Sequence, residues 1–290
     1  MLEGIPFGNF YFGVAIILRN SLLVSSLLCN SEAWYNVTKA EMELLESVDV
    51  ILLRSILRAP KSTPKEMLYL ELGCVPFREI VRKRRLSFLY YILHEKPDSM
   101  VYKFFEAQLR NRTAKDWVTA VLNDLEVLNV NVNFEEIKLM KKSTFSNMIK
   151  QSIQIKALSD LNNIKSSHSK VLHIKHTVLE MQRYFKSSKM DITQEEVRLI
   201  FKLRCRVTNL KTNLRGAYDS HECGICSEED ETQEHILKCK GLTNMKKEKN
   251  VIPDYENLFH GKMSEQLEIA RIFNENMKLK DKLLIEEYKT

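Results

Sequence analysis

The chain has 290 residues and a formal net charge of +6 at pH 7; 44% of its residues are hydrophobic and 28% are charged, as is ordinary for a globular protein. Its 8 glycines and 6 prolines are few for a fold rich in tight turns, which argues against many short strands and for long helices. The 6 cysteines are too sparse for the disulfide framework of a small secreted protein, so an intracellular location, cytoplasmic or nuclear, is expected.

The first apolar segment, "NFYFGVAIILRNSLLVSSLLCNSEAW", is interrupted by polar residues. Arg19 and Asn20 divide it into runs too short to cross a bilayer. Glu3 precedes the first run and no lysine or arginine does, unlike the start of a signal peptide. We therefore expect a buried helix and no membrane association, and the apolar surface of this helix could receive a protein partner.

The helical pattern extends over residues 10–57. In its second half, the residues that recur at intervals of three and four are Leu44, Leu45, Val48, Ile51, Leu52, Ser55 and Ile56. These side chains are expected to face the core, and the acidic side chains of Glu41, Glu43 and Glu46 are expected to face away from it.

Prolines separate the next two helices from the first. Thr63 is the expected N-cap of a short helix that begins at Pro64, and Gly73 ends it. Residues 76–94 form a helix with one apolar and one basic face. Its consecutive cations are candidates for contact with phosphate groups: Arg82, Lys83, Arg84 and Arg85.

Further amphipathic helices follow along the chain. The expected segments are 100–109, 115–130, 133–161, 171–185 and 193–207. Thr193, with Glu196 three residues later, is the expected capping box of the last of these. A charged helix from about Ser264 to the end could either dock or remain free.

The segment "ECGICSEEDETQEHILKC", residues 222–239, contains four potential metal ligands with the spacing C-x2-C-x8-H-x3-C. These ligands are Cys223, Cys226, His235 and Cys239. Two cysteines two residues apart can bind one ion from a tight turn, and a histidine and a cysteine four residues apart share one helical face. A closed set of thiolates and imidazole suits structural Zn²⁺ rather than a catalytic metal. A Cys223–Cys226 disulfide, or an unrelated grouping, is the alternative.

Basic residues flank this segment on both sides. The upstream candidates for contact with nucleic acid are Lys202, Arg204, Arg206, Lys211 and Arg215. Cations around a small zinc-folded unit favour binding to a phosphate backbone, and asparagines and a tyrosine between them could contact unpaired bases. The alternative is a solvated, charged helix face.

The order of these segments resembles the C-terminal part of a LINE-type (non-LTR) retrotransposon reverse transcriptase. The resemblance extends from "RNSLLVSSLLCNSEAWYNVTKAEMELLESVDVILLRSIL" through "TPKEMLYLELGCVP" and the basic helix to "LIFKLRCRV" and the CCHC motif. It implies a thumb followed by a C-terminal zinc-knuckle domain that grips template RNA or target DNA. The catalytic palm of that family carries an Asp-Asp pair, and this chain has no Asp-Asp dipeptide, so a non-catalytic fragment is expected.

The sequence thus predicts a mainly α protein, a helical bundle-like array with a small zinc knuckle near the C-terminus. We expect a thumb-like helical region over 1–75, a helical connector over 76–200, the basic segment and knuckle over 201–245, and a charged linker and helix over 246–290. Nucleic-acid binding is the favoured function. A helical scaffold for protein partners, with a purely structural zinc, is the alternative.

Overall fold

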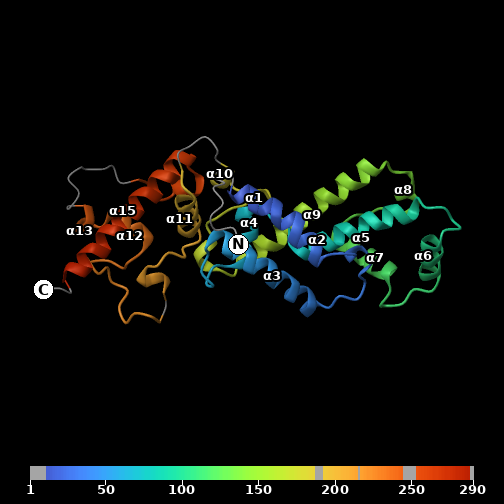
Figure 1. The fold of residues 1–290 in the computed structure, drawn as a ribbon, viewed down its shortest axis with the longest axis horizontal. Coiled ribbons are helices and arrows are strands. Elements are labelled where there is room, and N and C mark those ends of the chain that lie inside the picture. Colours follow the sequence, from blue (N-terminus) through green and yellow to red (C-terminus); the bar gives the residue numbers. More distant parts are fainter. Residues whose placement is uncertain (1–10, 187–191, 215, 244–252, 288–290) are drawn as a thin grey trace.

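The computed structural model describes residues 11–186, 192–214, 216–243 and 253–287. Within these ranges the chain forms helices and no β-strand, only two isolated bridges, so the predicted mainly α class is confirmed. The array is elongated (Figure 1): helices α5 to α9 occupy one end, α11 to α15 the other, and the first helices lie between them.

The N-terminal helical segment is continuous but not regular. Helix α1 (Tyr11–Leu18) leads through a π-helical turn (Arg19–Leu23) into α2 (Val24–Leu27), and a short 3-10 turn (Ser31–Ala33) follows. Arg19 is 2% exposed, and its guanidinium donates to both carboxylate oxygens of Asp49 at 2.6 and 2.5 Å. In the described part of the chain, no helix is both long and apolar enough to cross a membrane.

Helix α3 (Lys39–Leu57) is rotated relative to the predicted orientation. Asp49 and Glu46 on this helix are buried, whereas Leu44 and Ile51 are 70% and 67% exposed. The prediction that Glu46 faces away from the protein was wrong, because its carboxylate receives two hydrogen bonds from the Arg78 guanidinium at 2.7 and 2.6 Å. The inward face of α3 therefore carries Leu53, Ile56 and Leu57 together with two ion-paired carboxylates.

Helix α4 (Lys65–Leu72) is almost entirely buried, and α5 (Phe77–Leu93) follows it. Pro64 rather than Thr63 occupies the N-cap position of α4, so the predicted cap is one residue early. Gly73 ends α4 with a φ of 65°, as expected. A Cβ at Gly73 would lie 2.1 Å from the backbone nitrogen of Met181, so only glycine fits there.

The part of the connector region from α5 to α9 has its own apolar core. Helices α6 (Met100–Arg110), α7 (Trp117–Val127), α8 (Phe134–Leu139) and α9 (Lys142–Lys165) surround α5. Buried side chains of this core include Leu86, Leu89, Phe105, Val121, Phe145 and Ile149. The predicted helix over 133–161 is in fact two helices, which separate at Met140.

The predicted helix over 171–185 was wrong. This segment contains a 3-10 turn (Ser169–Val171), an irregular stretch and one helical turn, α10 (Arg183–Lys186). Side chains of α9 occupy its backbone acceptors: Lys165 Nζ donates to the carbonyl of Ile174, and Asn162 Nδ2 donates to that of His176. The backbone N–H of Gln182 donates to the carbonyl of Glu71 at 3.0 Å. Tertiary hydrogen bonds therefore replace those of a helix.

The C-terminal elements pack into one body. They are α11 (Gln194–Arg204), a 3-10 turn (Lys211–Asn213), α12 (Gln233–Lys238), α13 (Lys240–Thr243), α14 (Asn257–His260) and α15 (Met263–Glu287). The predicted Thr193–Glu196 capping box of α11 is present. Helix α15 is docked, because it contacts both α11 and α12.

One apolar core joins the two ends of the chain. Its buried members include Phe12, Leu70, Phe201 and Ile269. Residues from the expected thumb-like region, the knuckle region and the C-terminal helix therefore contribute to the same cluster. The second apolar cluster, around α5 and α9, lies beside it and forms the core of the end of the array that holds α5 to α9 (Figure 1).

Candidate metal centre

A tight turn and a short helix bring the four predicted ligands together. The backbone N–H of Ser227 donates to the carbonyl of Cys223 at 2.9 Å, and Ser227 itself has a φ of 55°. This turn places Cys223 and Cys226 side by side. Thr232 caps the N-terminus of α12 by accepting from the backbone N–H of His235, which fixes the start of the helix that carries the second ligand pair.

The ligand atoms of Cys223, Cys226, His235 and Cys239 all lie within 4.8 Å of one another. The sulfurs of Cys223 and Cys239 are 3.9 Å apart, and Cys226 Sγ lies 3.3 Å from His235 Nε2. A tetrahedral ion with metal–sulfur bonds of about 2.3 Å requires sulfurs about 3.8 Å apart. The cluster therefore has the size that one tetrahedral metal ion needs. A disulfide would need a separation of about 2 Å, and the three cysteines of the cluster are free thiols.

The cluster is enclosed by protein. Cys223 and Cys239 are each 1% exposed and His235 is 4% exposed. The second ring nitrogen of His235, Nδ1, lies 3.1 Å from a carboxylate oxygen of Glu229. A carboxylate that accepts from the far nitrogen of a histidine fixes the tautomer in which Nε2 is free to bind a metal. Glu229 thus completes the cluster as an orienting residue.

The thiols of the cluster differ in acidity. Burial opposes ionisation of Cys226, but the backbone N–H groups of Glu228 and Glu229 outweigh it and lower the pKa of that thiol. Burial raises the pKa of Cys239 to about 11. Without a cation this thiol stays protonated at neutral pH, so metal binding at the cluster releases a proton.

The acidic loop between the ligand pairs is partly buried. Glu231 is 1% exposed; its carboxylate accepts from the backbone N–H of Lys211 at 3.2 Å and pairs with Lys280 Nζ at 2.6 Å. Asn276 Nδ2, also on α15, donates to the carbonyl of Ile236 at 2.7 Å. The C-terminal helix therefore supports the metal cluster directly. Its sequence carries no motif that would have indicated this.

Arg204, a predicted nucleic-acid contact, lies in the core instead. It is 4% exposed; its Nη2 donates to Glu71 at 2.9 Å and its Nη1 to the carbonyl of Leu258 at 2.8 Å. Two further side chains contact the same carboxylate. The Tyr184 hydroxyl donates to Glu71, and His176 Nε2 lies 3.0 Å from a Glu71 oxygen. The prediction for Arg204 is corrected, because a buried guanidinium that neutralises Glu71 cannot reach a phosphate.

This buried cluster makes stability depend on pH. Burial alone would raise the pKa of Glu71, but Arg204 and His176 outweigh it and hold the pKa at about 2. A carboxylate with a depressed pKa stabilises the fold above its ordinary pKa of 4.5 and loses that contribution as the pH falls towards 2. We expect about 3 kcal/mol of the free energy of unfolding to be lost in this window.

The measurement is urea unfolding of the wild type and of Glu71→Gln between pH 6 and pH 3. Both proteins contain the other carboxylates, so the difference between their pH profiles reports on Glu71 alone. The free energy of unfolding should fall more steeply in the wild type. Parallel pH profiles for the two proteins would contradict the role given to Glu71.

The other upstream cations lie nearer the surface. Arg206 Nη2 pairs with Glu234 at 2.7 Å, and its side chain is 37% exposed. Lys211 is half-buried, and its Nζ donates to the carbonyl of Glu222 at 2.8 Å. Lys202 is half-buried on α11. Arg215 lies outside the described residues.

The basic cluster of α5 is divided between solvent and internal contacts. Lys83 is exposed. Arg84 donates to the carbonyl of Leu28, and Arg85 is 9% exposed and pairs with Asp124 at 3.3 Å. Arg82 also pairs with Asp124, at 3.5 Å. Of the four cations, Arg85 is corrected to a structural residue, because it is buried and paired with Asp124; Arg82 and Arg84 are half-buried, and their prediction as phosphate contacts stays a prediction.

Comparison of the chain with protein-family models, with curated protein sequences and with solved structures gives no match. What the fold and the site define is therefore a class: a mainly α protein with a Cys₃His cluster that could hold a metal ion.

Proposed function

We propose that the protein is a non-catalytic module that binds single-stranded nucleic acid, RNA or DNA, and that a structural Zn²⁺ at the Cys₃His cluster folds its knuckle. On this proposal the chain corresponds to the C-terminal region of a LINE-type reverse transcriptase. The observation that carries it is the tetrahedral spacing of the four ligand atoms in a segment with basic flanks.

Zinc is favoured by the chemistry of the donors. Three thiolates and one imidazole form a soft, closed, four-coordinate set, which leaves no open position for a substrate or water. Such an ion stabilises the segment without taking part in a reaction. The proposal therefore assigns the metal to folding and assigns binding to the cations around it.

The cations that remain available for phosphate are those not held inside the protein. Lys202 and Lys211 lie upstream of the knuckle, and Lys238 and Lys240 follow it, with side chains 54% and 80% exposed. The carboxylates of Glu228 and Glu229 lie 3.7 to 3.9 Å from the last two lysines and reduce their net attraction for an anion. Lys202 and Lys211 are therefore the residues to test first.

Replacing both Lys202 and Lys211 with alanine should weaken binding to a single-stranded oligonucleotide and reduce its salt dependence. Each phosphate contact to a single strand contributes about 0.7 to the slope of log K against log salt, so the double variant should lose about 1.4. Fluorescence anisotropy with a labelled oligouridylate across a series of salt concentrations measures this slope.

The matched control changes two exposed lysines of α9, Lys142 and Lys150, to alanine, which removes the same charge from another part of the molecule. Its slope should remain close to that of the wild type. Equal slopes for both double variants, or binding that ignores salt, would count against the proposed contacts.

A scaffold for protein partners is the second candidate, and the outer face of α3 favours it. Leu44, Val48 and Ile51 are 70%, 39% and 67% exposed and follow one another along that helix. A complex that persists at high salt, carries no nucleic acid and is lost on Ile51→Glu would support this function instead.

A further inference from the structure

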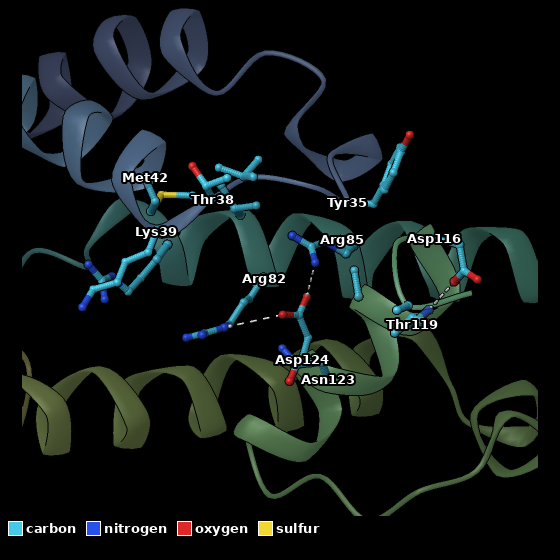
Figure 2. A pocket seen from close by; sticks show the side chains of 15 residues that line it. Tyr35, Thr38, Lys39, Met42, Arg82, Arg85, Asp116, Thr119, Asn123 and Asp124 are labelled. Carbon is cyan, nitrogen blue, oxygen red and sulfur yellow. Dashed lines mark hydrogen bonds and ion pairs between the residues drawn. The ribbon is translucent and has the colours of Figure 1, made fainter. Parts of the chain in front are cut away.

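A cavity of about 530 Å³ lies between the N-terminus of α3, the middle of α5 and α7, and it is separate from the metal cluster. Figure 2 shows it from close by, with Lys39 and Met42 on one wall and Asp116 and Thr119 on another. Two arginines of the predicted basic cluster, Arg82 and Arg85, line it from α5. Arg82 and Arg85 therefore face a cavity in addition to their internal ion pairs.

The walls of the cavity are fixed by internal contacts. The segment before α3 is tied to α7, because Trp117 Nε1 donates to the carbonyl of Glu32 at 2.8 Å. It is tied to α5 as well, because Arg84 Nη1 lies 3.3 Å from the hydroxyl of Ser31. Tyr35, in this segment, therefore lines the rim of a preformed cavity rather than of a loose loop.

Four cations and two carboxylates line the cavity, and carboxylates outside the lining, Glu46 and Glu79, pair with two of the cations, Arg78 and Arg82. The lining cations are Lys39, Arg78, Arg82 and Arg85, and the lining carboxylates are Asp116 and Asp124. Asp116 is engaged as the N-cap of α7, where it accepts from the backbone N–H of Thr119 at 2.7 Å. Asp124 lies between Arg82 and Arg85, as the dashed lines in Figure 2 show.

Carboxylates hold the arginines in place without using all their donors. Arg82 contacts Glu79 through Nη1 and Asp124 through Nε, and a guanidinium has five N–H groups. Its side chain is 21% exposed, so a further acceptor can reach it. Lys39, whose side chain is 86% exposed and whose Nζ lies 3.9 Å from a carboxylate oxygen of Glu43, adds an exposed cation to the lining. Together these groups suit one phosphate.

The rest of the lining suits a base. The ring of Tyr35 is at the rim and 53% exposed, Val37 and Met42 supply apolar surface, and Asn123 supplies an amide. An exposed aromatic face beside cations is the arrangement with which proteins hold unpaired bases. A simple anion would make no use of these side chains.

We propose that this cavity holds one unpaired nucleotide of a bound strand, with its phosphate at Lys39 and Arg82 and its base against Tyr35. The inference rests on the proposed binding of single-stranded nucleic acid and adds a second contact to it, remote from the knuckle in sequence. Recognition uses the phosphate and the face of the base, so RNA and single-stranded DNA are both accepted.

The test uses the full chain and a short oligouridylate that carries 5-iodouridine. Ultraviolet crosslinking followed by mass spectrometry should attach the probe to the peptide that contains Tyr35. Lys39→Ala and Tyr35→Leu should each weaken binding of the same oligonucleotide about tenfold, the effect of losing one charge-assisted hydrogen bond or one stacked base.

Lys83→Ala is the matched control, because it removes an exposed lysine of α5 that does not line the cavity. Its affinity should change much less than that of Lys39→Ala. All these side chains are at the rim or surface, so thermal unfolding should show wild-type stability.

The outcomes separate the cavity from the proposed function. Oligonucleotide binding with crosslinks only near the knuckle, unaffected by Lys39→Ala and Tyr35→Leu, would overturn the cavity site and leave the proposed function standing. Absence of oligonucleotide binding in the wild type would remove both. Equal losses of affinity in Lys39→Ala and Lys83→Ala would mean that the loss reflects only the net charge of the protein, and would overturn the site.

Discussion

Arg204→Ala is expected to destabilise the protein by about 3 to 5 kcal/mol, because it leaves the buried carboxylate of Glu71 without its counter-ion. Glu71 is fully enclosed, and Arg204 is the residue that neutralises it across a contact between α4 and α11. The substitution also removes the donor to the carbonyl of Leu258, which precedes α15. Urea unfolding followed by circular dichroism measures the loss.

Arg206→Ala is the matched control for this experiment. It lies two residues further along, and its pair with Glu234 is partly exposed on both sides, so we expect a loss below about 1 kcal/mol. If Arg204→Ala kept wild-type stability and lost only affinity for nucleic acid, the buried ion pair would not be the reason for this arginine, and its interpretation as a phosphate contact would be restored.

Arg204 also shows where sequence reasoning reached its limit. Its neighbours Lys202 and Arg206 are partly exposed, and a run of cations on a helix reads as one basic face. Arg204 faces the core because it pairs with Glu71, 133 positions earlier in the chain. The sequence of α4, which carries Glu71, does not indicate that this acid is buried. Long-range pairing of charges is invisible to periodicity, because both partners look like surface residues.

Helix α3 shows the same limit from the apolar side. Its stripe at three- and four-residue spacing predicted a helix correctly, and the helix ends at Leu57 as expected. Its start at Lys39 was not predicted, because the helical pattern was expected to extend over residues 10–57. The side that faces the core was predicted only in part. Leu45, Leu52 and Ile56 pack against the core as expected, but Asp49 and Glu46 also face inward, against Arg19 and Arg78. Hydrophobic periodicity assumes that the core is apolar, and here ion pairs between distant segments override it.

The metal cluster was predictable because its information is local. Four ligands fall within 17 residues of sequence, and the turn and helix that carry them form from short-range contacts. Its supporting residues were not predictable. Glu231 lies in an acidic stretch and Lys280 on a charged helix, and nothing in the sequence links them, yet the two pair in the interior beside the cluster.

Removing the proposed zinc is expected to unfold the knuckle and release α15. The ligand atoms lie at the spacing that one ion needs, and without an ion no bond joins the three thiols and the imidazole. Structural zinc supplies about 10 to 16 kcal/mol of apparent binding free energy in comparable small units, far more than the surrounding hydrogen bonds. The contacts of Lys280 and Asn276 depend on the position of that segment.

The measurement combines metal content with hydrogen exchange in the wild type and in a Cys226→Ser, His235→Ala double variant. We expect one zinc per chain in the wild type, none in the double variant, and loss of amide protection in α12 and α15. Cys29→Ser, which alters an exposed cysteine outside the cluster, should retain the metal and the protection.

Protection in α5 and α9 should survive in the double variant, because their core around Leu86 and Ile149 has no member in the knuckle. Loss of protection throughout the chain would instead mean that the metal stabilises the whole fold through the core shared by Phe12 and Ile269. Zinc that remains bound after both ligands are removed would contradict the site itself, since two thiols cannot complete a tetrahedron.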